Sequence, residues 1–420
     1  MKDEFDAVVV GGGLAGSTAA LDLARKGLSV ALIAPLSDED RRTTALMKPS
    51  IDFMERLGLW EALKDRAAPL ATMRIVDGTR NLFRAPTVAF HAGEIGEEAF
   101  AQNIPNADLL EALSQAIAAE KNLARFETTA IGASENDDRV EIELADGRRL
   151  GANLAVAADG RRSVLRQAAH IGTRSWQYPQ AALVTTFSHR LPHENISTEF
   201  HTEDGPFTQV PLPGNRSSLV WVMKPEDAQA LLRLGTTNLG ERIEERMQSL
   251  LGKVDIDGEP QQFPLSGQIA HRFGRNRIVL IGEAAHVFPP IGAQGLNLGL
   301  RDVEALSRCI EVAGAGGGAS LGDAYDRSRR FDVTSRTIAV DLLNRSLLGT
   351  FLPSQFARSA GLAVLDRLAP LRQVIMREGL RPGDSIRAFG RDWRSRMERL
   401  SSPTTSSTGS ARPTPSESRH

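Results

Sequence analysis

The sequence of 420 residues predicts an α/β protein with a parallel sheet near its start, an antiparallel sheet in its middle and helices toward its end. Three observations carry this prediction. A strand, glycine turn, helix and strand follow one another at 5–34, short apolar runs separated by Pro, Gly and Asn fill 181–223, and an Arg-rich helical stretch follows residue 320. Because domains usually hold ~100 to 200 residues, the length favours two domains.

The N-terminal unit begins with an apolar run at 5–10, which breaks at Gly11, and an Ala- and Leu-rich helical segment runs to Arg25. The run "LSVALIA" then indicates a second buried strand. Gly11, Gly13 and Gly16 occupy the positions of a G-x-G-x-x-G turn, which permits close approach of a pyrophosphate. The helix N-terminus supplies free N–H groups and positive dipole. This Rossmann-like unit predicts a dinucleotide site.

The acidic residue that normally ends the second strand and binds the ribose is absent here. Ala34 stands in its place and Pro35 follows it. Asp38, Glu39 or Asp40 in the next loop could take over this role, or the ribose is held less tightly.

The middle of the chain reads as strands. Residues 140–150 alternate apolar and polar side chains around an Asp-Gly turn at 146–147, which predicts a hairpin. A buried strand from residue 153 ends at a second Asp-Gly pair, Asp159 and Gly160. The runs at 181–223 predict an antiparallel sheet, and "PEDAQALLRL" predicts a helix start with more helix up to Leu251.

A second glycine-rich crossover follows the apolar run "NRIVLIG". The loop "IGEAAHVFPPIGAQGLNLG" leads into a helix whose apolar residues recur every three or four positions: Leu296, Leu300, Val303, Leu306 and Ile310. Open α/β sheets bind ligands at such strand-to-helix crossovers. The loop therefore predicts a ligand site in which backbone groups do most of the binding, and a structural Pro-Gly loop is the alternative.

Composition excludes several function classes. A net charge of -2 and a pI near 6.5 give no positive field for nucleic acid. Cys309 is the single cysteine, so no internal disulfide or thiolate metal cluster is expected, and no metal site is predicted. The acidic start "MKDEFDAVVVGGG" resembles no export signal, and no apolar run approaches the ~20 residues of a membrane span. These features predict a cytoplasmic protein.

Three motifs stand in order: "GGGLAG", "AADGRRSVLR" and "IGEAAHVFPPIGAQGLNLGLRD". Together they resemble the class A flavoprotein monooxygenases, among them para-hydroxybenzoate hydroxylase, and within that class the ubiquinone-biosynthesis hydroxylases of the UbiH and UbiF type. Segments such as "DRRTTALMKPSIDFMERLGLW" and "YDRSRRFDVTSRTIAVDLLNR" extend the resemblance over nearly the whole chain except its tail.

The resemblance implies the domain organisation of para-hydroxybenzoate hydroxylase, with a Rossmann-like FAD-binding domain, an antiparallel β-sheet substrate domain and C-terminal helices. On this pattern we expect an FAD-binding domain at 1–75, 98–175 and 266–330, a substrate domain at 76–97 and 176–265, a helical region at 331–400, and a disordered tail at 401–420.

FAD is the nucleotide that the resemblance implies, with its ADP half on the first crossover and its flavin near the second. The residues expected to bind it are Gly11, Gly13, Leu14, Ala15, Gly16, Arg42, Gln102, Asp159, Glu283, Pro290, Gly292, Gln294, Gly295, Leu296 and Asn297. Glu283 stands where relatives usually have Asp, which moves the charge outward by one methylene.

Several of these residues have a plain structural alternative. Arg42 suits forked hydrogen bonds to phosphate but also fits an exposed helix start. Gln102 and Asn106 match only a loose motif, and Asp159 also fits an ordinary turn. His286 could act as a base, but a histidine at a helix start that supports the loop is favoured. No catalytic side chain is named.

The implied reaction is hydroxylation of a polyprenylated phenol in ubiquinone biosynthesis by dioxygen, through a flavin hydroperoxide. NAD(P)H or a protein donor supplies the electrons. Residues 339–375 interleave Leu and Phe with Arg, which fits contact with the inner membrane, internal helix packing or a homodimer face. A hydroxylase or epoxidase of another small aromatic or lipid substrate, and a non-catalytic FAD-bound scaffold in a ubiquinone-biosynthesis complex, are the alternatives. A halogenase is disfavoured because the tryptophans form no Trp-x-Trp motif.

Overall fold

The computed structural model describes residues 3–35, 40–79, 86–136, 138–290, 294–314, 318, 320–348, 373 and 376, without the side chains of 339–348. Asp38, Glu39, Gly292, the tail at 401–420 and most of the segment 339–375 therefore lie outside the described residues or side chains.

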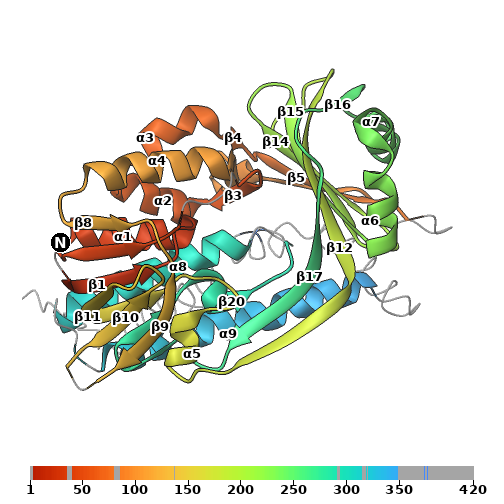
Figure 1. Ribbon diagram of the computed structural model, residues 1–420. Coiled ribbons are helices and arrows are strands. Elements are labelled where there is room, and N and C mark those ends of the chain that lie inside the picture. The colour runs from red at the N-terminus through yellow and green to blue at the C-terminus, as the bar shows by residue number, and fades with distance from the viewer. Residues whose placement is uncertain are drawn as a thin grey trace, which may run out of the picture.

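A mostly parallel sheet forms the first half of the molecule (Figure 1). Its order is β18-β19-β11-β1-β2-β8, and the hairpin partners β10 and β9 continue from β11. The strands are β1 (Glu4–Val10), β2 (Val30–Ile33), β8 (Leu123–Phe126), β9 (Ala130–Glu135), β10 (Val140–Leu144), β11 (Arg149–Ala157), β18 (Gly274–Arg275) and β19 (Ile278–Leu280). Strand β1 pairs in parallel with both β2 and β11, which confirms the predicted crossover unit. Strands β10 and β11 pair antiparallel, which confirms the hairpin at 140–150.

Helices pack around this sheet and contribute to the same apolar core. They are α1 (Leu14–Arg25), α2 (Lys48–Arg56), α3 (Trp60–Leu63), α4 (Asn106–Ala119), α5 (Val164–Ala168), α8 (Gln294–Ala313) and α9 (Leu321–Leu348), with short 3-10 turns η1 (Lys64–Arg66), η2 (Ala92–Ile95) and η3 (Gly282–Ala284). In α8 the predicted stripe is buried at Leu300, Val303, Leu306 and Ile310, as its spacing requires. Among the described helices, none is both long and apolar enough to cross a membrane.

A nine-stranded sheet forms the second half, in the order β20-β17-β12-β15-β14-β13-β5-β6 with β16 beside β12. The strands are β5 (Thr72–Asp77), β6 (Val88–His91), β12 (Thr173–His189), β13 (Ile196–His201), β14 (Pro206–Leu212), β15 (Arg216–Met223), β16 (Val254–Ile256), β17 (Gln261–Ala270) and β20 (His286–Val287). Helices α6 (Pro225–Leu232) and α7 (Gly235–Arg246) cover its outer face in Figure 1, where Phe187, Phe207 and Ile243 share one apolar cluster. The predicted antiparallel sheet is confirmed.

Strand β12 is longer than the sequence indicates, since the predicted run began at Ala181 and the strand begins at Thr173. Its pairing with β17 shifts register between Gln177 and Ala181, around Pro179. Proline has no N–H for the ladder, so it is tolerated at such an irregularity, and the apolar pattern starts only beyond it. Figure 1 shows β12 and β17 running together from the first half of the molecule into the second.

A small sheet of β3 (Thr43–Met47), β7 (Ala101–Pro105) and β4 (Ala68–Pro69) connects the two halves. The Thr43 hydroxyl donates to Ser218 Oγ at 2.9 Å, and Asn103 Nδ2 donates to the carbonyl of Pro211 at 2.8 Å. These hydrogen bonds hold the small sheet to the nine-stranded sheet. The division into domains at the boundaries given above stays a prediction.

Candidate functional site

The two glycine-rich crossovers, distant in the chain, lie against each other. A Cβ added to Gly282 would lie 3.3 Å from the Cβ of Ala15, and one added to Gly299 would lie 3.4 Å from the same atom. Gly282 follows β19, Gly299 is in α8, and Ala15 is in the first turn of α1. The start of the first helix therefore packs directly on the second crossover.

The Asp-Gly motif joins them. Gly11 has a φ of +114°, and a Cβ there would lie 2.2 Å from the carbonyl oxygen of Ala158, so only glycine fits. A Cβ on Gly16 would lie 2.0 Å from the Gly11 carbonyl oxygen and 2.9 Å from the Cβ of Ala158. All three sequence motifs thus meet at one place.

Asp159 uses one of its two carboxylate oxygens in a structural hydrogen bond. Its Oδ2 accepts from the backbone N–H of Val164 at 2.6 Å, at the start of α5. Its Oδ1 is buried and has no hydrogen-bond partner among the described residues. Since a buried carboxylate oxygen without a donor is costly, this atom suits a hydroxyl donor from a bound group.

The start of α1 fits an anionic nucleotide. Gly13 is the N-cap of the helix, without a side-chain cap, and a Cβ placed on it would meet none of the described residues within 4 Å. Helix geometry leaves the first-turn N–H groups, those of Leu14, Ala15 and Gly16, without partners inside α1. Helix N-termini bind phosphate in this way, so the residues present fit the pyrophosphate of a dinucleotide.

Arg42 lies within electrostatic reach of Glu283 in the second crossover, but its guanidinium is partly engaged. Its Nε and Nη2 donate to the carboxylate of Asp40 at 2.8 and 2.7 Å, and Asn106 donates to the same carboxylate at 3.0 Å. The hydrogen bonds that Arg42 donates to Asp40 raise the pKa of Arg42, and the charge of Glu283 adds to this effect. Asp40 is thus used to orient Arg42, while the Arg42 side chain remains 51% exposed.

Glu283, the departure from the family pattern, lies at the surface of this region. It belongs to η3, its side chain is 54% exposed, and it pairs with Arg161 Nε at 3.4 Å. Arg161 is held in turn by the hydroxyl of Ser266 at 2.7 Å. The carboxylate of Glu283 is therefore solvated and is held by an exposed ion pair. Its contact with FAD stays a prediction.

At the start of α8, the side chain of Asn297 is buried and fully used. Its Oδ1 accepts from the N–H of Met47 at 2.9 Å and the hydroxyl of Ser50 at 2.7 Å, and its Nδ2 donates to the Ala45 carbonyl at 2.8 Å. It therefore fastens β3 and α2 to α8. Four other predicted residues lie close by in the chain: Pro290 and Gly295 are exposed, and Gln294 and Leu296 are half-buried. Gln102 is half-buried in β7, where it pairs with Leu46 of β3.

His286 supports the loop from β20, not from a helix start as the sequence suggested. This short strand pairs with β17, which draws the loop toward the antiparallel sheet. The buried imidazole lies 2.7 Å from Oδ2 of Asp302 and stacks on Phe288, with ring centroids 5.3 Å apart. These contacts fit the supporting role that the sequence favours.

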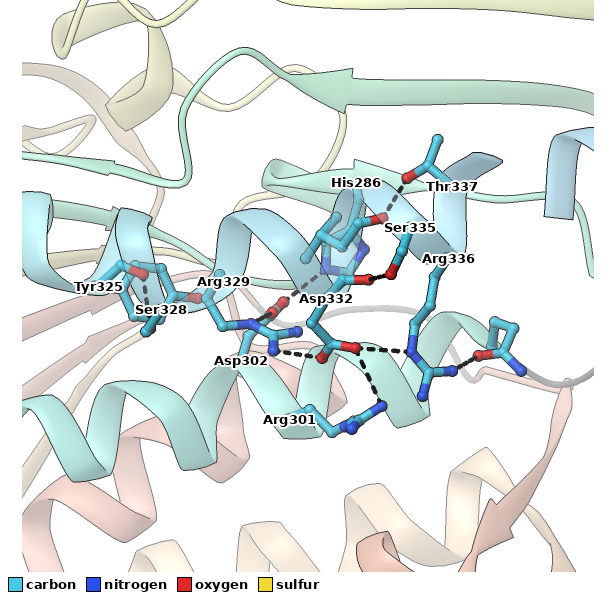
Figure 2. Close-up of polar contacts among 12 residues, drawn as sticks. His286, Arg301, Asp302, Tyr325, Ser328, Arg329, Asp332, Ser335, Arg336 and Thr337 are labelled. Atoms are coloured by element: carbon cyan, nitrogen blue, oxygen red, sulfur yellow. Dashed lines mark hydrogen bonds and ion pairs between the residues drawn. The ribbon is translucent and has the colours of Figure 1, made fainter. Parts of the chain in front are cut away.

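Sequence reasoning missed the buried ionic partners of His286. Asp302 on α8, together with Arg329 and Asp332 on α9, forms the cluster in Figure 2. Asp302 is adjacent to Val303 of the apolar stripe, and a carboxylate beside such a stripe is a signal that could have found it.

The inner face of the nine-stranded sheet, the one opposite α6 and α7, is half-buried. Register places Glu199, Thr208, Val220 and Val184 side by side across four strands of this face. Ser218, two residues before Val220, points to the same face and bonds the small sheet. The inner face is therefore turned toward the small sheet of β3, β7 and β4. It carries a polar pair, His201 Nε2 and Glu199 Oε1, at 2.8 Å.

Comparisons with known proteins agree with this geometry. The family described as "FAD binding domain" matches residues 4–338. The chain is 34% identical over 387 residues to a ubiquinone hydroxylase, UbiL, of Rhodospirillum rubrum, covering 89% of each protein. It is 30% identical to the 3-demethoxyubiquinol 3-hydroxylase of Escherichia coli, over 89% of this chain and 97% of that one.

Solved structures show the same fold. The p-nitrophenol 4-monooxygenase PnpA of Pseudomonas putida superposes with a TM-score of 0.76 at 20% identity, over 90% of this chain and 99% of the other. Klebsiella pneumoniae HpxO, solved with FAD and uric acid, gives 0.72 at 17% identity, over 90% and 96%. With its motifs gathered at one site and a family match over most of its length, the chain belongs to the FAD-binding class A flavoprotein monooxygenases and is an FAD-dependent enzyme of that family.

Proposed function

We propose that this protein hydroxylates the aromatic ring of a polyprenylated phenol in ubiquinone biosynthesis. The observation that carries the proposal is similarity over nearly nine-tenths of the chain to relatives named as ubiquinone hydroxylases. The inner face of the nine-stranded sheet supports it, because half-buried valines such as Val184, Val210 and Val220 suit an apolar substrate.

FAD, when bound, supplies the electrons that activate dioxygen and delivers one oxygen atom to the ring. The chain's own residues bind and orient FAD and the substrate. The first turn of α1 holds the pyrophosphate, with Arg42 beside it. The start of α8 directs N–H groups and positive dipole toward the flavin, where negative charge develops on reduction. The inner face of the sheet excludes water from the reacting ring.

We propose that the Glu199 and His201 pair binds the phenolic hydroxyl of the substrate. A phenol becomes more electron-rich when its proton is removed, so hydroxylation is helped by a positioned acceptor. His201 Nε2 bonds Glu199 Oε1, and Thr208 Oγ1 donates to Glu199 Oε2 at 3.3 Å. The carboxylate orients the imidazole, which then accepts the phenolic proton through its other nitrogen.

A prenylated substrate is itself membrane-bound. We therefore propose that the protein works in the cytoplasm with peripheral contact to the inner membrane, within a ubiquinone-biosynthesis complex or as a homodimer. NAD(P)H or a protein donor supplies the electrons.

The test uses one phenol carrying side chains of increasing isoprenoid length. Protein reduced without oxygen is mixed with ¹⁸O-labelled dioxygen, and the product is analysed by mass spectrometry. Each buried CH₂ contributes about 0.8 kcal/mol, so the first isoprenoid unit should raise kcat/KM about tenfold or more. Labelled product with this dependence supports the proposal. Equal rates for all lengths would favour a hydroxylase of a small soluble phenol, and an unlabelled ring would refute hydroxylation.

A further inference from the structure

The carboxylate of Asp302 joins the beginning of the flavin loop to α8; by flavin loop we mean the described residues 282–290 together with Gln294. Its Oδ2 accepts from the backbone N–H of Gly282 at 3.0 Å and lies 2.7 Å from His286 Nε2. Its Oδ1 accepts from Arg329 Nε at 2.7 Å (Figure 2). Burial raises the pKa of Asp302, but the charges of His286 and Arg329 outweigh burial and hold it below its usual value.

A second set of contacts runs from Asp302 to the other end of the flavin loop. Arg329 Nη1 donates to Asp332 Oδ2 at 2.6 Å, and Asp332 Oδ1 accepts from Arg336 Nε at 3.0 Å. Arg336 Nη1 donates in turn to the side-chain oxygen of Gln294. Gln294 is the first residue of α8, so one chain of polar contacts fixes both ends of the loop, as Figure 2 shows for its labelled members.

We propose that Asp302 and Arg329 are positioning residues for the flavin, which set where the backbone N–H groups of the flavin loop and of the α8 start meet its reactive ring. The inference requires FAD binding and not the proposed substrate. Neither residue touches FAD itself, since both act through Gly282, His286 and Gln294.

The ionic character of the cluster supports a positioning role. Asp302 and Arg329 have side chains only 1% and 4% exposed. Burying such a pair costs desolvation that often exceeds the attraction, so apolar side chains would pack α8 on α9 at least as stably. Hydrogen bonds with fixed directions, by contrast, hold the backbone in one position. The buried ion pair therefore fixes the position of the backbone and adds little to the stability of the fold.

Helix α9 offers a matched control. Asp326 is a second buried carboxylate on α9; it accepts from the N–H of Phe273 at 2.8 Å and pairs with Arg330. It anchors α9 beside β18 and has no described contact with the flavin loop. Asp326→Asn therefore removes a comparable buried carboxylate from the helix that packs on α8 and carries Arg329.

The experiment compares Asp302→Asn with Asp326→Asn in FAD affinity, measured by fluorescence titration, and in the reduction potential of the bound flavin. Asp302→Asn should raise the Kd for FAD about tenfold or more, as changes in residues that orient ligand-binding groups do, and should make reduction harder. Asp302→Glu should restore part of both. Asp326→Asn should lower the melting temperature of the apoprotein while leaving both flavin properties unchanged.

Wild-type affinity and potential in Asp302→Asn, or equal changes in both asparagine variants, would overturn the proposal. Arg336→Met covers the case in which Asp302→Asn does not fold. This variant releases only the Gln294 end of the loop, so it should shift the reduction potential in the same direction as Asp302→Asn but by a smaller amount. An unchanged potential in Arg336→Met would also overturn the proposal. No aromatic substrate is used, so the outcome is independent of the proposed reaction.

Discussion

Replacing Gly13 with alanine should weaken FAD binding while leaving the fold of the apoprotein intact. A Cβ at this position meets no atom of the described residues within 4 Å, and the backbone has an ordinary extended conformation at φ -70°. The methyl group would therefore occupy only the space into which the first turn of α1 directs its N–H groups, where the pyrophosphate is expected.

The size of the effect follows from the contacts at risk. A hydrogen bond to a charged group contributes about 1.5 to 3 kcal/mol, so losing one from the pyrophosphate should raise the Kd about 10- to 150-fold. Folding changes little, because alanine is a poorer N-cap than glycine by about 1 kcal/mol but restricts the unfolded chain by about 0.4 to 1 kcal/mol.

Gly16→Ala is the contrasting variant. Its Cβ would lie 2.0 Å from the Gly11 carbonyl oxygen, so the backbone must move and the apoprotein should lose about 1 to 3 kcal/mol or more of stability. Fluorescence titration gives the Kd, and thermal unfolding of the apoprotein gives the stability. Wild-type affinity in Gly13→Ala, or a loss of stability in it as large as in Gly16→Ala, would refute the assignment of this space to the pyrophosphate.

Three further predictions follow. Arg42→Ala should raise the Kd for FAD about tenfold or more, which is the loss expected for one charged hydrogen bond. The stability of the fold should hardly change, because the Arg42 side chain is half exposed. An unchanged Kd in the fluorescence titration would exclude Arg42 from the FAD site. Glu199→Gln should lower kcat about 100-fold or more, because the imidazole of His201 loses the carboxylate that orients it as a general base. The affinity for FAD should not change. A normal kcat would exclude the Glu199 and His201 pair from the mechanism. The pKa of Asp302 is lowered in the fold, so its stabilisation is complete above the unfolded value of ~3.9 and is lost as pH falls through the folded value. Acid unfolding of Asp302→Asn apoprotein should consequently be less steep below pH ~4, which a denaturant titration at several pH values would detect.

The sequence predicted the elements whose signal is local. Strand β1, the glycine turn and α1 follow from an apolar run, three glycines and a helical stripe within thirty residues. The apolar spacing of α8 placed its buried face correctly. The adjacency of the two crossovers was also predicted, through the resemblance, and depends in the structure on small residues such as Ala15 and Gly282 that allow close packing.

The rest depends on partners far apart in the chain. Nothing local indicates that Arg329 will reach Asp302, 27 residues earlier, or that Asn297 will bond the backbone of Met47, 250 residues away. The pairing of Arg42 with Asp40 was missed for a different reason. The two residues are close in sequence, but a surface salt bridge and a phosphate contact use the same side-chain type, so the pattern alone does not separate them.

The most direct test of the account is competition for FAD by its two halves. ADP should occupy the start of α1 and riboflavin the start of α8, so each should weaken apparent FAD binding in a fluorescence titration without displacing the other. If ADP left FAD binding unchanged, or if riboflavin displaced ADP, the two crossovers would not hold opposite ends of one FAD molecule.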